Sequence, residues 1–115
     1  MPGAPHIEVE IEYLPTDKGG RKSPGFSGYR PQFYYNGNDW DAEHEYPDVD
    51  QVAPGETARA TLRLMSPDQH WGKLTIGTPF LIREGNRTIA FGKVTKLLPD
   101  FETDARDLLS ESASG

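Results

Sequence analysis

Strict alternation between apolar and polar residues in two segments constrains the fold of this 115-residue chain more than any other feature. In residues 7–13 the apolar side chains occupy the odd positions and glutamates occupy the even ones. In residues 57–65, alanine and leucine at the even positions alternate with threonine and arginine. A period of two is typical of a half-buried β-strand, because successive side chains point to opposite faces of a sheet.

Shorter strand-like segments and turn signals lie between these two segments. Residues 30–35 are rich in aromatic side chains and predict a strand, and Asn36-Gly37 predicts the turn that follows it. The acidic run after this turn predicts a short edge strand at residues 42–46, since charge on a sheet edge discourages pairing between molecules.

A second hairpin is predicted near the end of the chain. Glu84-Gly85-Asn86 separates two strand-like segments, residues 80–83 and 87–96. Glycine and proline are frequent, with 12 and 10 residues, as expected for a small, turn-rich, all-β domain. A chain of this length fits one such domain.

Several classes of site are excluded by what the sequence lacks. It contains no cysteine, which excludes disulfides and thiolate metal sites. It also lacks the G-x-x-x-x-G-K-[ST] loop that cradles phosphates, so no GTP binding is expected. No apolar run reaches the length of a membrane span, and we expect no signal peptide, because no apolar run follows Met1. We therefore expect a cytoplasmic protein with no bound cofactor and no membrane contact.

Charge is distributed unevenly along the chain, whose formal net charge is −6. Residues 39–50 contain six carboxylates and no lysine or arginine, and residues 99–115 contain five carboxylates against one arginine. The basic residues gather in residues 18–30 and 73–96. Such asymmetry bears on the choice of partner rather than on the fold.

Three blocks of sequence are similar to one known family. Residues 19–35 read GGRKSPGFSGYRPQFYY, residues 80–96 read FLIREGNRTIAFGKVTK, and Pro54-Gly55-Glu56 lies between them. In this order, these blocks resemble the third, C-terminal domain of bacterial elongation factor Tu. The resemblance covers roughly residues 7–98 and stops after Leu98. The segment between Pro67 and Phe80 is longer than in the family and carries His70 and Trp71.

The resemblance implies a single six-stranded antiparallel β-barrel that stands alone, without a GTPase domain. Residues 1–6 would form a flexible N-terminal end, residues 7–98 the barrel, and residues 99–115 an acidic, disordered tail. Met1 and the extra C-terminal segment favour a full gene product over an excised domain. Alternation and resemblance together predict a core that contains Ile7, Val9, Ile11, Phe33, Leu62, Leu64, Ile82 and Ile89.

The resemblance also implies which residues face a partner, because this domain of the family helps to hold the T-stem backbone of aminoacyl-tRNA. The matching positions are Arg21, Lys22, Gln32, Asp41, Ser66, Glu84 and Gly85, and Arg30 adds a cation in the same region. Lys22 replaces a histidine of the family, Asp41 replaces a threonine, and Ser66 stands where many members have a basic residue or histidine. A carboxylate in a phosphate-facing position weakens binding to nucleic acid. The alternative role for Arg21 is to cap backbone carbonyls.

For the aromatic residues and the histidines, we expect structural roles rather than roles in binding or catalysis. Phe33 and Tyr35 share one face of their strand, and we expect that face to be core rather than a base-stacking surface. His44 lies among acids but matches no zinc or calcium spacing, so we expect it on a solvated edge. His70 is expected in a surface loop. No catalytic constellation is visible, and we expect no enzyme activity.

Two functions remain open from the sequence. The first is a binding module derived from elongation factor Tu whose partner is a protein. The alternative is a translation elongation component that keeps a weak contact with aminoacyl-tRNA.

Overall fold

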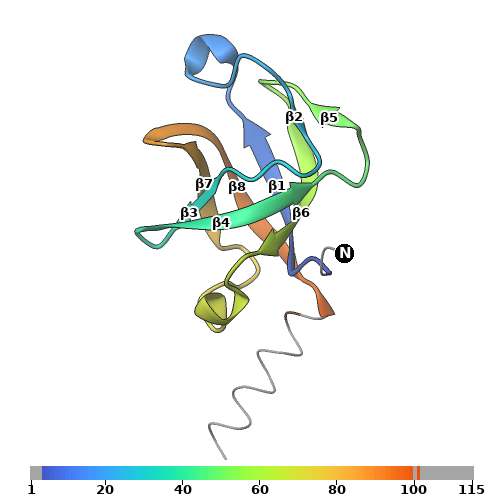
Figure 1. Cartoon of the computed structure of the whole chain (residues 1–115), viewed down its shortest axis with the longest axis vertical. Coiled ribbons are helices and arrows are strands. Elements are labelled where there is room, and N and C mark those ends of the chain that lie inside the picture. The colour runs from blue at the N-terminus through green and yellow to red at the C-terminus, as the bar shows by residue number, and fades with distance from the viewer. Residues whose placement is uncertain (1–3, 100, 102–115) are drawn as a thin grey trace, which may run out of the picture.

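Six antiparallel strands close into a barrel in the computed structural model, which describes residues 4–99 and 101 (Figure 1). Around the barrel the strands follow the order β1-β6-β4-β3-β7-β8. Their bounds are β1 Ile7–Tyr13, β3 Gln32–Tyr35, β4 Asn38–Glu45, β6 Thr57–Leu64, β7 Pro79–Glu84 and β8 Arg87–Leu97. The described part of residues 7–98 has no α-helix. The predicted fold class is confirmed.

Short elements lie at both ends of this barrel (Figure 1). A separate two-stranded sheet pairs β2 (Gly25–Phe26) with β5 (Gln51–Val52) and lies near the 3₁₀ turn η1 (Thr16–Lys18). A second 3₁₀ turn, η2 (Pro67–His70), lies at the opposite end of the barrel (Figure 1).

The core forms from the inward faces of all six barrel strands. Every predicted core residue is buried, each with 2% or less of its surface exposed: Ile7, Val9, Ile11, Phe33, Leu62, Leu64, Ile82 and Ile89. Tyr35 is buried beside Phe33, with ring centroids 5.4 Å apart, so the aromatic strand faces the core as predicted. Burying apolar surface of this kind is the main stabilising contribution to such a fold.

Both predicted hairpin turns are present. Asn36 and Gly37 have φ angles of 52° and 84° between β3 and β4. Positive φ at two central residues matches the right-handed twist of the flanking strands, which is why Asn-Gly is favoured there. Gly85, with φ of 61°, begins the two-residue connection from β7 to β8.

The prediction of an acidic edge strand at residues 42–46 is wrong. β4 is longer and is paired on both sides: residues 38–41 pair with β3, and residues 42–45 pair with β6. Its acids alternate with inward side chains and face outward from a closed barrel, in which β4 lies between β6 and β3 rather than at an edge.

The ordered barrel extends beyond the predicted limits of residues 7 and 98. His6 is held at both backbone groups: its N–H donates to Leu62 O and its carbonyl accepts from Leu98 N, each at 2.9 Å. Phe101 is buried, and its ring centroid lies 5.9 Å from that of His6. The predicted flexible end therefore does not include His6, and the predicted disordered tail does not include Phe101. Residues 1–3, 100 and 102–115 lie outside the described residues.

Candidate functional site

The first group of predicted site residues meets at the end of the barrel covered by β2 and β5. Arg21 Nε lies 3.5 Å from Glu84 Oε2, although 63 residues of sequence separate the two. The Tyr29 hydroxyl donates to the same Glu84 oxygen at 2.8 Å, and the Arg21 guanidinium lies 4.4 Å from the centre of the Tyr29 ring. Glu84 Oε1 also lies 3.4 Å from Arg87 Nη2. One carboxylate thus serves two arginines.

Arg21 is committed to contacts within its own chain. Its Nη1 donates to Pro24 O at 3.4 Å, in addition to the ion pair with Glu84. This contact with one carbonyl is of the kind expected if Arg21 caps backbone carbonyls. A guanidinium that is already paired contributes less to binding a phosphate, because the internal contacts must be exchanged for new ones.

A cluster of tyrosines lies next to the Arg21–Glu84 ion pair. The hydroxyls of Tyr13 and Tyr46 are hydrogen-bonded to one another, and Tyr29 and Tyr46 both lie beside the ring of His44. Burial raises the pKa of Tyr13, Tyr29 and Tyr46 above the ordinary value. Gly25 packs on the cluster so closely that a Cβ there would lie 3.2 Å from the Tyr46 hydroxyl. A residue with no side chain therefore lets the 21–28 loop approach and hold Arg21 in place.

The second group of predicted site residues surrounds a shallow polar pocket on the outer face. Gln32 on β3 lies opposite Asp41 on β4 and Arg83 on β7. The pocket has a volume of about 210 Å³ and is lined by Gln32, Asp39, Trp40, Asp41, Met65 and Ser66. Gln32, Asp41 and Ser66 therefore line one pocket.

Charge in this pocket is negative rather than positive. Asp39 lies 3.4 Å from Arg83, whose guanidinium is 4.8 Å from the centre of the Tyr34 ring. Asp41 is exposed and forms no ion pair with any described residue. A phosphate entering the pocket would meet this free carboxylate.

The remaining predicted residues lie in the connecting segments. Lys22 and Arg30 are exposed, and neither forms an ion pair or side-chain hydrogen bond within the described part of the chain. Gly85 is exposed at the tip of the β7–β8 hairpin, next to Glu84. Among the predicted site residues, Lys22 and Arg30 are the cations most available to an anionic partner.

His44 is not on a solvated edge, contrary to our expectation. Its side chain is fully buried, Nδ1 donates to Ala42 O at 3.2 Å, and the ring lies beside those of Tyr29 and Tyr46. Burial lowers the pKa of His44 to about 4. No set of three or more metal-binding side chains occurs among the described residues.

His70 is likewise buried rather than exposed in a loop. The Tyr35 hydroxyl and His70 Nδ1 form a hydrogen bond of 2.5 Å, and the His70 ring lies 4.6 Å from that of Trp40. Burial and, to a lesser extent, the positive charge of Lys73 lower the pKa of His70 to about 4. The longer segment after Pro67 thus places a histidine in the end of the barrel.

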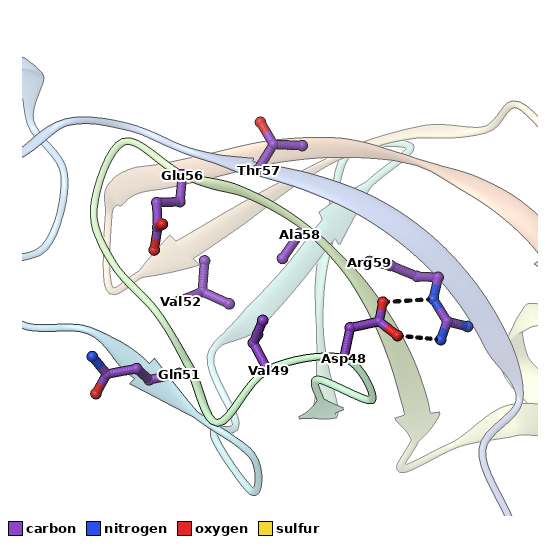
Figure 2. Close-up of a pocket in the computed structure, with 8 residues that line it drawn as sticks. All are labelled: Asp48, Val49, Gln51, Val52, Glu56, Thr57, Ala58 and Arg59. Atoms are coloured by element: carbon purple, nitrogen blue, oxygen red, sulfur yellow. Dashed lines mark hydrogen bonds and ion pairs between the residues drawn. The ribbon is translucent and has the colours of Figure 1, made fainter.

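A pocket that none of the predicted site residues lines lies between β6 and the loop that carries β5. Its volume is about 200 Å³, and its lining is Asp48, Val49, Gln51, Val52, Glu56, Thr57, Ala58 and Arg59 (Figure 2). The Asp48 carboxylate accepts two hydrogen bonds from Arg59, at 3.0 and 2.8 Å. Arg59 also donates to Glu8 at 2.8 Å. The signal for this pocket in the sequence is Pro47, which comes two residues after the end of β4 and lacks the N–H that would continue the ladder with β6.

No helix in the described part of the chain is long and apolar enough to cross a membrane. The sequence matches the family described as Elongation factor Tu C-terminal domain over residues 3–98, which is most of the chain. The match spans the whole barrel, including the Arg21–Glu84 group and the Gln32–Asp41 pocket. The chain belongs to the elongation factor Tu C-terminal domain family.

Proposed function

We propose that this translation-factor-related barrel is a non-enzymatic, cytoplasmic binding module whose partner is a protein. The observation that carries the proposal is the charge of the surface that the resemblance assigns to tRNA. Arg21 is paired with Glu84 at 3.5 Å, and Asp41 places an unpaired carboxylate beside Gln32. Both features work against a phosphate backbone, whose binding depends on cations that release counterions.

The pocket beside β6 is a second, independent argument for a protein partner. Val49, Val52 and Ala58 line it together with charged residues, and Val49 is 47% exposed (Figure 2). Apolar side chains ringed by polar ones are typical of protein interfaces rather than of nucleic-acid surfaces.

A second candidate is a translation component that retains contact with aminoacyl-tRNA. The observation in its favour is that five cations lie around β3 and the β7–β8 hairpin against three carboxylates. The cations are Arg21, Lys22, Arg30, Arg83 and Arg87, and the carboxylates are Asp39, Asp41 and Glu84. Lys22 and Arg30 are the two that make no internal ion pair with described residues.

A tRNA gel shift at about 150 mM salt separates the two candidates, because surface charges more than a Debye length away are screened there. We expect no complex tighter than the ~10⁻⁴–10⁻⁶ M that is typical of non-specific association. Arg21→Ala and Lys22→Ala serve as a matched pair, one cation paired internally and one exposed. A sub-micromolar complex that is lost in Arg21→Ala would show that the tRNA candidate is correct.

Asp41→Thr, which restores the hydroxyl that the family has at this position, tests the electrostatic reason. If Asp41 opposes phosphate binding, this variant binds tRNA more tightly than the natural chain and with a steeper salt dependence. Equal binding by the two proteins would mean that Asp41 does not lie on the path of the phosphates.

A further inference from the structure

We infer that the unpaired edge of β6 binds an extended, basic segment of the protein partner as an added β-strand. The inference rests on the proposed function, a protein partner, and assigns the place and the mode of binding. It requires an open strand edge, a pocket for a side chain and a charge that selects the partner.

The edge is open because β4 stops short of the beginning of β6. On one side β6 pairs with β1 from Thr57 to Leu62, whereas on the other side it pairs with β4 only from Thr61 to Leu64. Pro47 follows β4 two residues after its end, and proline has no N–H with which to continue a ladder. Residues 57–60 therefore have a strand partner on one edge only, within the described chain.

Within residues 4–99 and 101, no other segment pairs with this edge through backbone hydrogen bonds. Among the described residues, backbone hydrogen bonds outside the strand ladders do not involve residues 57–60. The loop of residues 46–56 passes beside this edge, and the pocket of about 200 Å³ lies between the loop and β6 (Figure 2). Unpaired N–H and C=O groups along a strand edge are a template for an extended peptide.

The pocket between the loop and β6 can accommodate an apolar side chain of the added strand. Val49, Val52 and Ala58 point into the space between the loop and β6 (Figure 2). Val52 and Ala58 also contribute to the core, whereas Val49 remains 47% exposed. A second hollow of about 390 Å³ lies along the paired strands β1 and β6 and shares Thr57, Ala58 and Arg59 with the first.

The charge around the edge selects a cationic partner. Glu8, Glu10, Asp48 and Glu56 line the two hollows, and Arg59 is the one basic residue in their lining. Arg59 is already neutralised, because it donates to Asp48 and Glu8 at 2.8–3.0 Å and holds the pKa of Asp48 below its ordinary value. Lysine or arginine side chains that alternate with aliphatic ones along the added strand match this pattern.

The test uses a synthetic seven-residue probe, acetyl-Lys-Val-Arg-Ile-Lys-Val-Arg-amide, titrated into the full chain while backbone amide signals are followed by NMR. We expect saturable binding, with the largest shifts at residues 48–52 and 57–60. A probe in which glutamate replaces each lysine and arginine controls for charge and should not bind. Absence of saturable binding by the basic probe up to millimolar concentration, or shifts centred elsewhere, overturns the inference.

Two further probes separate strand addition from simple charge attraction. They carry N-methyl groups on alternate residues, one on the odd and one on the even positions, so each loses the hydrogen bonds of one strand edge. Strand addition uses a single edge of the peptide, so one of the two probes should bind and the other should not. Equal binding by both would overturn strand addition.

Val49→Asn removes the exposed apolar wall of the pocket without changing charge, and Ile76→Asn is the matched control at an apolar residue that is 68% exposed. We expect about tenfold weaker probe binding for Val49→Asn and unchanged binding for Ile76→Asn. Equal affinities in the two variants count against the pocket. Failure of this inference would leave a protein partner on another face, whereas failure of the proposed function would appear as Arg21-dependent tRNA binding.

Discussion

Acidification from pH 7 to pH 5 should destabilise the barrel through His44. The side chain is fully buried and its pKa is lowered to about 4, whereas a histidine in an unfolded chain has a pKa near ~6.5. The unfolded state therefore binds more protons than the folded state between these two values. The stability that neutral His44 provides is complete above about pH 6.5 and is lost as the pH falls toward 4.

The expected size of this effect follows from the two pKa values. The difference corresponds to a loss of about 2 kcal/mol in the free energy of unfolding between pH 7 and pH 5. His44→Leu removes the titrating group and also its buried Nε2, which has no hydrogen-bond partner among the described residues. The variant should therefore lose about 2 kcal/mol less than the natural chain over the same interval.

Urea unfolding at pH 7, 6 and 5 measures this difference directly. Carboxylates and His70 titrate in both proteins, so their contributions cancel in the comparison. The natural chain and His44→Leu losing the same free energy between pH 7 and pH 5 would refute the assignment of a neutral, buried His44. His70→Gln provides a second comparison. Because burial also lowers the pKa of His70, this variant should likewise lose less free energy of unfolding than the natural chain between pH 7 and pH 5.

Three further predictions concern packing and nucleotide binding. Gly92→Ala should destabilise the barrel by a few kcal/mol, roughly the cost of overpacking, because the added Cβ would lie 2.2 Å from Glu10 O. Thermal unfolding measures this change, and an unchanged unfolding midpoint would contradict the close approach of the two strands. Phe101→Ala should lower the unfolding midpoint, with a cost of up to about 3 kcal/mol for a buried ring, whereas an unaltered midpoint would mean that Phe101 does not pack on the barrel. Isothermal calorimetry should detect no GTP binding, because the sequence has no phosphate-cradling loop, and micromolar affinity would disprove this.

The alternation of apolar and polar residues was enough to predict most of the barrel, because a two-residue period identifies the side chains that face inward. It placed Ile7, Val9 and Leu62 in the core correctly. The same rule held for His44, which shares its face with the apolar Ala42 and Tyr46, but the flanking acids favoured the incorrect prediction of a solvated edge. A polar residue on an apolar face is buried when the neighbouring positions of the same parity are buried.

Other features depend on tertiary contacts that no local pattern encodes. Nothing in the residues around Arg21 indicates that Glu84 lies beside it, since the contact depends on how the barrel closes. The burial of His70 is of the same kind, because η2 is too short for periodicity and its position is fixed by Tyr35 and Trp40. The pocket beside β6 arises where β4 is absent, and Pro47 alone marks that point in the sequence.

Closure of the barrel by β1 and β8 has a consequence for synthesis and for mechanical load. The first strand pairs with the last one along its whole length, so the ring of hydrogen bonds cannot be completed until β8 has left the ribosome. Contacts this distant in sequence slow folding, and the growing chain must keep the second edge of β1 from other strands until then. His6 and Leu98 meet at the same end of the β1–β8 ladder. A force that pulls the beginning of β1 away from the end of β8 therefore breaks the hydrogen bonds of this ladder one at a time.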